Sequence, residues 1–129
     1  MRLQTALETG CIIIFSMTIL FHLSVLFKLI PHTYVWGGRL MSDKAMYKFE
    51  SVSILLNIVF LVLILILSGY FQFHFSPKSA RIILWAMAGL FLLNTIGNLL
   101  SKNKIERIIF TPITFLIALL TFILSMQVE

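Results

Sequence analysis

Charged residues and cysteines are scarce in this chain of 129 residues, and each shortage excludes a class of protein. Only 12% of the residues are charged, which is about half the fraction found in an average soluble domain. Hydrophobic residues make up 60%, and the mean hydropathy is +1.03. The bilayer is therefore the expected solvent, and the length allows a single domain. The one cysteine, Cys11, excludes an intrachain disulfide and any site built on paired cysteines.

Common catalytic motifs are also missing. The sequence contains no H-E-x-x-H zinc motif, no G-x-S-x-G elbow and no phosphate-binding loop. A Ser-His-Asp triad stays open, but its aspartate would have to be Asp43, the only one in the chain, which falls in a connection. The sequence thus leans against an enzyme, predicts no metal site and identifies no cofactor.

The basic residues lie in the connections between apolar runs, and the formal net charge is +5. In a soluble protein this charge would suggest nucleic acid, but here no basic patch is combined with a soluble fold. We therefore exclude nucleic acid and expect the lipid bilayer and its anionic head groups as partners.

Long apolar runs dominate the chain, and each is long enough to cross a hydrocarbon core, which takes about 20 helical residues. The runs cover about residues 10–30, 51–73, 80–100 and 105–126. Pro31 ends the first run, and Ser42 is predicted to cap a second helix running from Asp43 to Phe73. Because the last two turns are short, successive helices should be antiparallel neighbours. The predicted fold is all-α: an integral membrane protein with four transmembrane helices in an up-down-up-down bundle.

The distribution of Lys and Arg predicts the orientation in the membrane. Seven of the ten lie on the face that holds the first and third connections: Lys28, Arg39, Lys44, Lys48, Lys102, Lys104 and Arg107. Positive charge is retained on the cytoplasmic side. We therefore expect a multi-pass protein of the cell (inner) membrane with both its N- and C-termini outside the cytoplasm.

Polar residues gather in the half of the predicted bundle nearest these basic connections. Polar groups are costly in lipid, so they should turn inward and find one another. We expect the carboxylates and amides to share one interior site near the cytoplasmic face, with His22 at its floor and Arg39 at its mouth. The candidate ligand- or ion-binding residues are His22, Arg39, Glu50, Asn57, Asn94, Asn98, Glu106 and Thr111.

His22, Glu50 and Arg39 each have more than one interpretation. An intramembrane histidine is a proton carrier, a metal or haem ligand, or a buried hydrogen-bonded group. Glu50 either belongs to the site or pairs with Arg39 or Lys48 at the interface. Arg39 follows two glycines, so it either clamps a phosphate or carboxylate or contacts lipid head groups.

The remaining candidates also have structural alternatives. The segment 103–106 reads Asn-Lys-Ile-Glu and resembles a capping box, in which Glu106 would only satisfy the start of a helix. The three asparagines can hold helices together without binding anything. Thr111 precedes Pro112, and threonine hydroxyls near a proline can compensate a backbone carbonyl that has lost its donor.

Three functions remain open from the sequence. The first is a small transporter, channel or small-ligand binder that uses the polar layer to hold a small molecule or ion. The second is an accessory or scaffold subunit, in which the layer only joins helices. The third is a membrane-embedded enzyme acting on a lipid or quinone, with a carboxylate or His22 as acid or base. We also expect a homo-oligomer or a partner membrane subunit, because one small bundle encloses little space.

Overall fold

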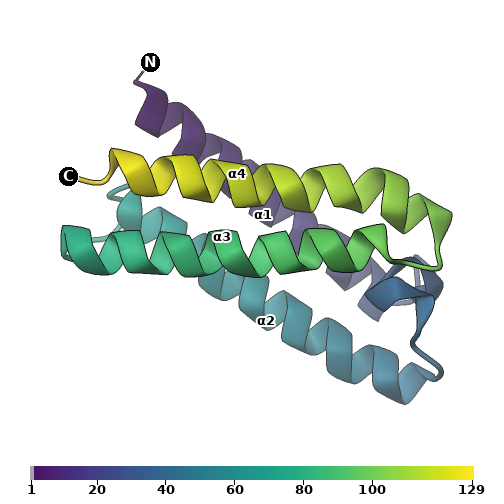
Figure 1. Ribbon diagram of the computed structural model, residues 1–129. Coiled ribbons are helices and arrows are strands. Elements are labelled where there is room, and N and C mark those ends of the chain that lie inside the picture. The colour runs from purple at the N-terminus through teal and green to yellow at the C-terminus, as the bar shows by residue number, and fades with distance from the viewer. Residues whose placement is uncertain (1) are drawn as a thin grey trace.

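The computed structural model describes residues 2–129, and long helices account for most of them (Figure 1). The helices are α1 at Leu3–Leu26, α2 at Asp43–Leu67, α3 at Pro77–Leu99 and α4 at Thr111–Gln127, with a π-helical turn, η3, at Glu106–Phe110. The described residues include no strand, and in this range four helical segments are long and apolar enough to span a membrane. The all-helical fold predicted from the sequence is confirmed.

The helices pack mainly in two pairs. α1 lies along α2 and α3 lies along α4, while α1 also contacts α4 and so joins the pairs. Figure 1 shows the N- and C-termini at one end of the bundle, which we call the terminal end. The opposite end, which we call the loop end, holds the α1–α2 connection and the α3–α4 turn.

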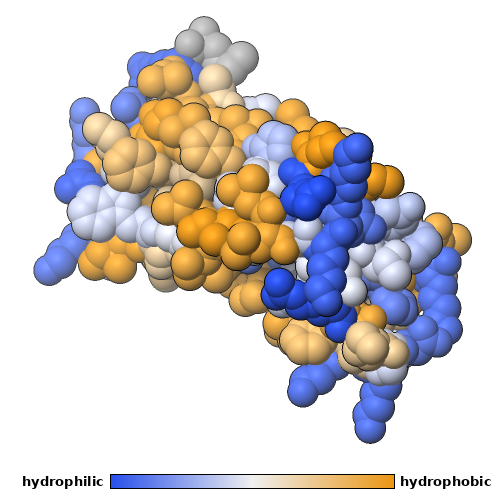
Figure 2. All heavy atoms as spheres, turned by 45° about the vertical axis from the view of Figure 1, so that its right-hand side comes forward, coloured by the Kyte–Doolittle hydropathy of each residue, from blue (hydrophilic) through white to orange (hydrophobic). Residues whose placement is uncertain are grey.

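A hydrophobic core joins all these helices. Phe15 of α1 and Leu84 of α3 are fully buried, as is Ile64 of α2, and Ile117 of α4 is almost so. Large apolar side chains also cover the outside of the helices. Figure 2 shows them as a broad apolar band with hydrophilic side chains toward both ends of the molecule. This distribution suits a membrane location.

Left-handed residues determine where α1 and α2 end. α1 begins at Leu3, earlier than the predicted start at residue 10, and stops at Leu26 because Lys28 adopts a positive φ of 61°. α2 begins at Asp43 as predicted, and Ser42 Oγ accepts a hydrogen bond from the amide of Ala45 at 3.1 Å. Its predicted end at residue 73 differs from the observed end at residue 67, because Gly69 has a φ of 80° and terminates the helix.

The last two helices start on recognisable signals. Ser76 caps α3, and Pro77 occupies the first turn, where its missing N–H costs nothing. α4 is preceded by the wide turn η3, which ends just before Pro112. Proline cannot donate to the carbonyl four residues earlier, so a regular α-helical ladder cannot run through this point.

Candidate functional site

The loop end is built on a strained turn between α1 and α2. Trp36, Gly37 and Gly38 all have positive φ, at 53°, 69° and 69°. Glycine adopts this left-handed region at little cost, whereas a tryptophan there requires support from its surroundings. Trp36 receives it from an aromatic contact with Phe49 of α2, with ring centroids 4.9 Å apart. Gly37 is buried within this turn.

Glu106 lies opposite this turn and accepts hydrogen bonds from it. The amide N of Gly37 lies 3.1 Å from Glu106 Oε2 and 3.3 Å from Oε1. The Ser101 hydroxyl donates to the same carboxylate, whose residue is only 4% exposed. The amide of Lys102 donates to the carbonyl of Gly37 at 3.2 Å. The α1–α2 connection is therefore joined to the α3–α4 turn through a buried carboxylate.

The capping box predicted at residues 103–106 is half correct. Asn103 Oδ1 accepts from the amides of Ile105 and Glu106 at 2.9 and 3.2 Å, as an N-cap does. The Glu106 side chain does not complete the box, since it turns to Gly37 instead of the Asn103 amide. That amide is satisfied by Ser101 Oγ at 3.0 Å.

His22 and Glu50 form a buried pair between α1 and α2. His22 Nδ1 lies 2.6 Å from Glu50 Oε2, Glu50 is fully buried, and the His22 side chain is 16% exposed. The interfacial pairing of Glu50 with Arg39 or Lys48 is not observed, because in the described chain its ion-pair partner is His22. Both alternative partners are exposed instead. Glu50 Oε1 is buried and has no hydrogen-bond partner among residues 2–129.

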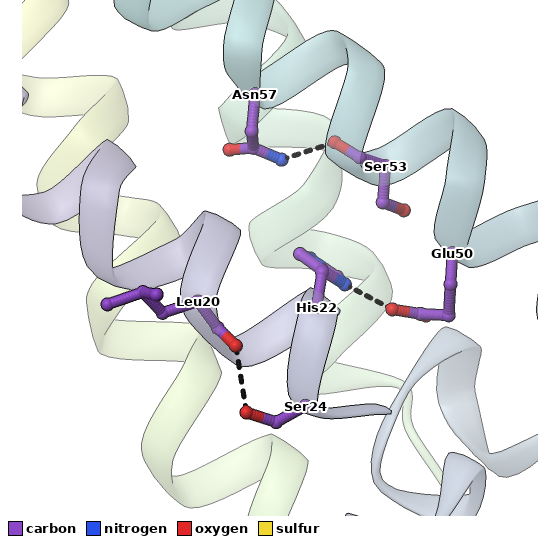
Figure 3. Close-up of polar contacts among 6 residues, drawn as sticks. All are labelled: Leu20, His22, Ser24, Glu50, Ser53 and Asn57. Atoms are coloured by element: carbon purple, nitrogen blue, oxygen red, sulfur yellow. Dashed lines mark hydrogen bonds and ion pairs between the residues drawn. The ribbon is translucent and has the colours of Figure 1, made fainter. Parts of the chain in front are cut away.

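Two more polar residues follow Glu50 on the face of α2 that meets His22. Figure 3 shows Glu50, Ser53 and Asn57 on this face, with His22 projecting from α1 toward them. Asn57 Nδ2 donates to the carbonyl of Ser53 at 2.8 Å. Its Oδ1 is buried and, within the described range, unpartnered, like Glu50 Oε1. Two buried acceptor oxygens therefore lie on one helix face without a donor, which is unusual in native interiors.

The two asparagines of α3 lie in different environments. Asn98 Nδ2 donates to Thr114 Oγ1 at 3.2 Å, and Thr95 Oγ1 lies 3.1 Å from the same oxygen, so these residues join α3 to α4. Asn94 is exposed on the outer face of α3. The Thr111 hydroxyl is buried and has no partner in the part of the chain that the structure describes.

The structure thus places the sequence candidates in separate groups. His22 and Glu50 meet between α1 and α2 and Asn57 lies on the same face of α2, whereas Glu106 bonds to the loop and Asn98 bonds to α4. No hydrogen bond joins these groups to one another within residues 2–129. Sequence reasoning left Ser53, Ser101 and Gly37 outside the candidate set, although Ser53 lies one turn from Glu50.

Exposed charges near the site pair with each other. Lys28 Nζ lies 2.7 Å from Asp43 Oδ2, and both side chains are more than half exposed. The hydrogen bond and the charge of Asp43 raise the pKa of Lys28 above its ordinary value. Solvent screens such a pair, so it contributes little to stability. Arg39 is also exposed and forms no ion pair with a described residue.

The pair at the α1–α2 site has the groups needed for proton transfer. Over residues 2–129, no three His, Cys, Asp or Glu side chains gather closely enough to hold a metal ion. An imidazole and a carboxyl group in contact can exchange a proton.

Comparison of the chain with protein-family models, curated proteins and solved structures gives no match.

Proposed function

We propose that this protein is a small integral membrane protein that moves protons or a proton-linked cation through the His22–Glu50 pair. The observation that carries the proposal is the state of Glu50. Its carboxyl group is fully buried, one oxygen contacts His22, and the other has no partner in the described chain. An ionisable residue inside an apolar helix bundle is expensive to keep, and such residues are typical of ion and proton pathways.

The geometry supports a relay in two steps. A proton arriving at the unpartnered Oε1 of Glu50 makes the carboxyl group neutral. Rotation of the carboxyl group then brings this proton to the 2.6 Å contact with His22, where a neutral imidazole accepts it at Nδ1 and releases the proton that it carried on Nε2. Asn57 Oδ1, on the same face of α2, offers a further acceptor for a water or a cation.

The proposal includes an orientation. If the four helices cross up-down-up-down, the seven of ten basic residues at the loop end support a cytoplasmic position for that end. The His22–Glu50 pair then lies in the cytoplasmic half of the membrane, and both termini lie on the other side.

Proton flux through reconstituted protein tests the proposal. Liposomes containing the protein and a pH-sensitive dye should acidify faster than empty liposomes when a potassium diffusion potential drives protons inward. Glu50→Gln keeps the size and the hydrogen-bonding capacity of the side chain but removes the titratable group. We expect this variant, and His22→Gln, to reduce the flux to the level of empty liposomes.

Asp43→Asn is the matched control, since it removes a carboxylate from the same end of the molecule at an exposed position. It should leave the flux unchanged, and circular dichroism should show equal helix content in all variants. Wild-type flux no greater than that of empty liposomes, or a Glu50→Gln variant as active as the wild type, would contradict the proposal.

A scaffold or accessory subunit is the second candidate function. It is favoured by the bonding of the other polar groups, since Glu106 accepts two donors and Asn98 bonds to Thr114. Glu106 is satisfied by the loop and the turn, and Asn98 by a residue of the neighbouring helix, as structural residues are. In this case Asn98→Leu should lower stability only slightly, and Glu50→Gln should have no effect on ion movement because there is none.

A further inference from the structure

A cavity lies at the terminal end, away from the His22–Glu50 pair. Its volume is about 470 Å³, which is in the size range of small-molecule sites. The start of α1, the end of α2, the start of α3 and the end of α4 contribute its walls. In Figure 1 these four helix ends lie together at the terminal end.

One charged group in this cavity is shielded from solvent. Glu8 lines the cavity and is only 8% exposed, and Gln4 Nε2 donates to its Oε1 at 2.8 Å. No described basic residue forms an ion pair with Glu8. The other charged lining residues, Arg2 and Glu129, are exposed, so solvent weakens their fields. The buried carboxylate therefore dominates the electrostatics of the cavity.

Part of the wall is apolar. Leu67 of α2 and Leu124 of α4 contribute to it, as does Phe75 in the α2–α3 connection. His74 beside Phe75 adds a polar edge. A buried carboxylate in a wall that is partly apolar favours a ligand with one positive charge and an apolar body, because such a ligand satisfies both surfaces at once.

The cavity is separate from the proposed proton pair. Glu8 and His22 lie on α1 about 21 Å apart along the helix axis at 1.5 Å per residue. Between them Phe15 packs with Phe60 and Phe91, with ring centroids 6.0 and 5.5 Å away. Cys11, fully buried, lies between Glu8 and these rings on α1. Ligand binding at the terminal end therefore does not depend on the proposed function.

We propose that the terminal-end cavity binds small amphiphilic monoamines, with the ammonium group paired to Glu8 and the apolar body against Leu67, Phe75 and Leu124. The pairing gives Glu8 a charged donor, which residues 2–129 do not supply. A neutral alcohol of the same shape gains the apolar contact and a hydrogen bond without the ionic attraction, so it should bind far more weakly.

Direct binding measurements test this site. The full chain is placed in lipid nanodiscs and titrated with 2-phenylethylamine at neutral pH. Isothermal titration calorimetry measures the binding. We expect saturable binding by the wild type and a dissociation constant at least tenfold larger for Glu8→Gln. The variant is nearly isosteric and retains a hydrogen bond to Gln4, so the helices should remain folded.

Two controls separate binding from partition into lipid. The neutral probe 2-phenylethanol should show no saturable binding to the wild type. Asp43→Asn, at the loop end, should bind the amine with unchanged affinity. Equal binding of amine and alcohol, equal binding by Glu8→Gln and the wild type, or an absence of saturable binding would overturn the proposal, whatever the outcome of the proton-flux experiment.

Discussion

Gly37 and Glu106 are separated by most of the chain, yet each depends on the other. Glu106 is a buried carboxylate that needs donors, and Gly37 presents its amide only because its backbone adopts a φ of 69°. A charged acceptor strengthens such a hydrogen bond, and loss of the donor would leave the carboxylate buried and underbonded. Position 37 therefore favours glycine for its left-handed backbone and for the hydrogen bond that this backbone allows to Glu106.

Substituting this glycine should destabilise the loop end. A Cβ at position 37 would lie 3.4 Å from the Arg39 side chain, but the larger cost is the left-handed backbone. We expect Gly37→Ala to lower the free energy of unfolding by about 1–2 kcal/mol. The measurement is the midpoint of an unfolding titration in a fixed detergent.

Gly97 provides the matched control. It lies within α3, has no positive φ, and a Cβ there would meet nothing within 4 Å. Alanine should raise helix stability there by roughly 0.5–1 kcal/mol. Equal effects of Gly37→Ala and Gly97→Ala would show that the left-handed turn contributes nothing special.

Residue identity predicted part of the candidate site. The depth of His22 and Glu50 placed them in the same half of the bundle, but nothing in the sequence selected His22 over Arg39 or Lys48 as the partner. Glu8 is not among the sequence candidates because it lies outside the apolar runs predicted to cross the membrane. Its spacing from Cys11 and Phe15, three and seven residues, is the helical signal that could have included it.

At the scale of elements, the helices were predictable and their rotation was not. Long apolar runs indicate helices because the backbone must satisfy its own hydrogen bonds in lipid. Such helices are apolar on nearly every face, so periodicity gives little indication of which side turns inward. Asn94 and Asn98 are one turn apart, yet the first is exposed and the second bonds to α4.

The start of α2 offers a test at this scale. Ser42 Oγ accepts from the Ala45 amide, which satisfies one of the free donors of the first turn. Ser42→Ala should reduce the free energy of unfolding by about 1 kcal/mol, and Ser42→Asp should restore it, since aspartate is an equally good cap.

Ser51, which is exposed within α2, is the control for this substitution. Alanine is the best helix former, so Ser51→Ala should not reduce stability. Unfolding midpoints that fall equally for positions 42 and 51 would rule out a capping effect.

At the scale of the whole molecule, the shared position of the termini makes orientation testable. Figure 1 places both at the terminal end, so they should lie on one side of the membrane. We expect alkaline phosphatase fused after residue 129 to be active in bacterial cells, because the basic loop end should stay in the cytoplasm. Green fluorescent protein fused at the same point should be dark. The reverse result would invert the proposed orientation. The homo-oligomer expected from the sequence stays a prediction.

The Phe15, Phe60 and Phe91 rings have an electrical consequence. They form an apolar layer between the cavity at one end and the polar pair at the other. A membrane potential falls across the whole low-dielectric part of the bundle, and the rings belong to it. A charge that stays at Glu8 or at Glu50 therefore does no work against the potential. A charge that passes the rings does, and a full crossing of the membrane corresponds to about 2.3 kcal/mol for each 100 mV.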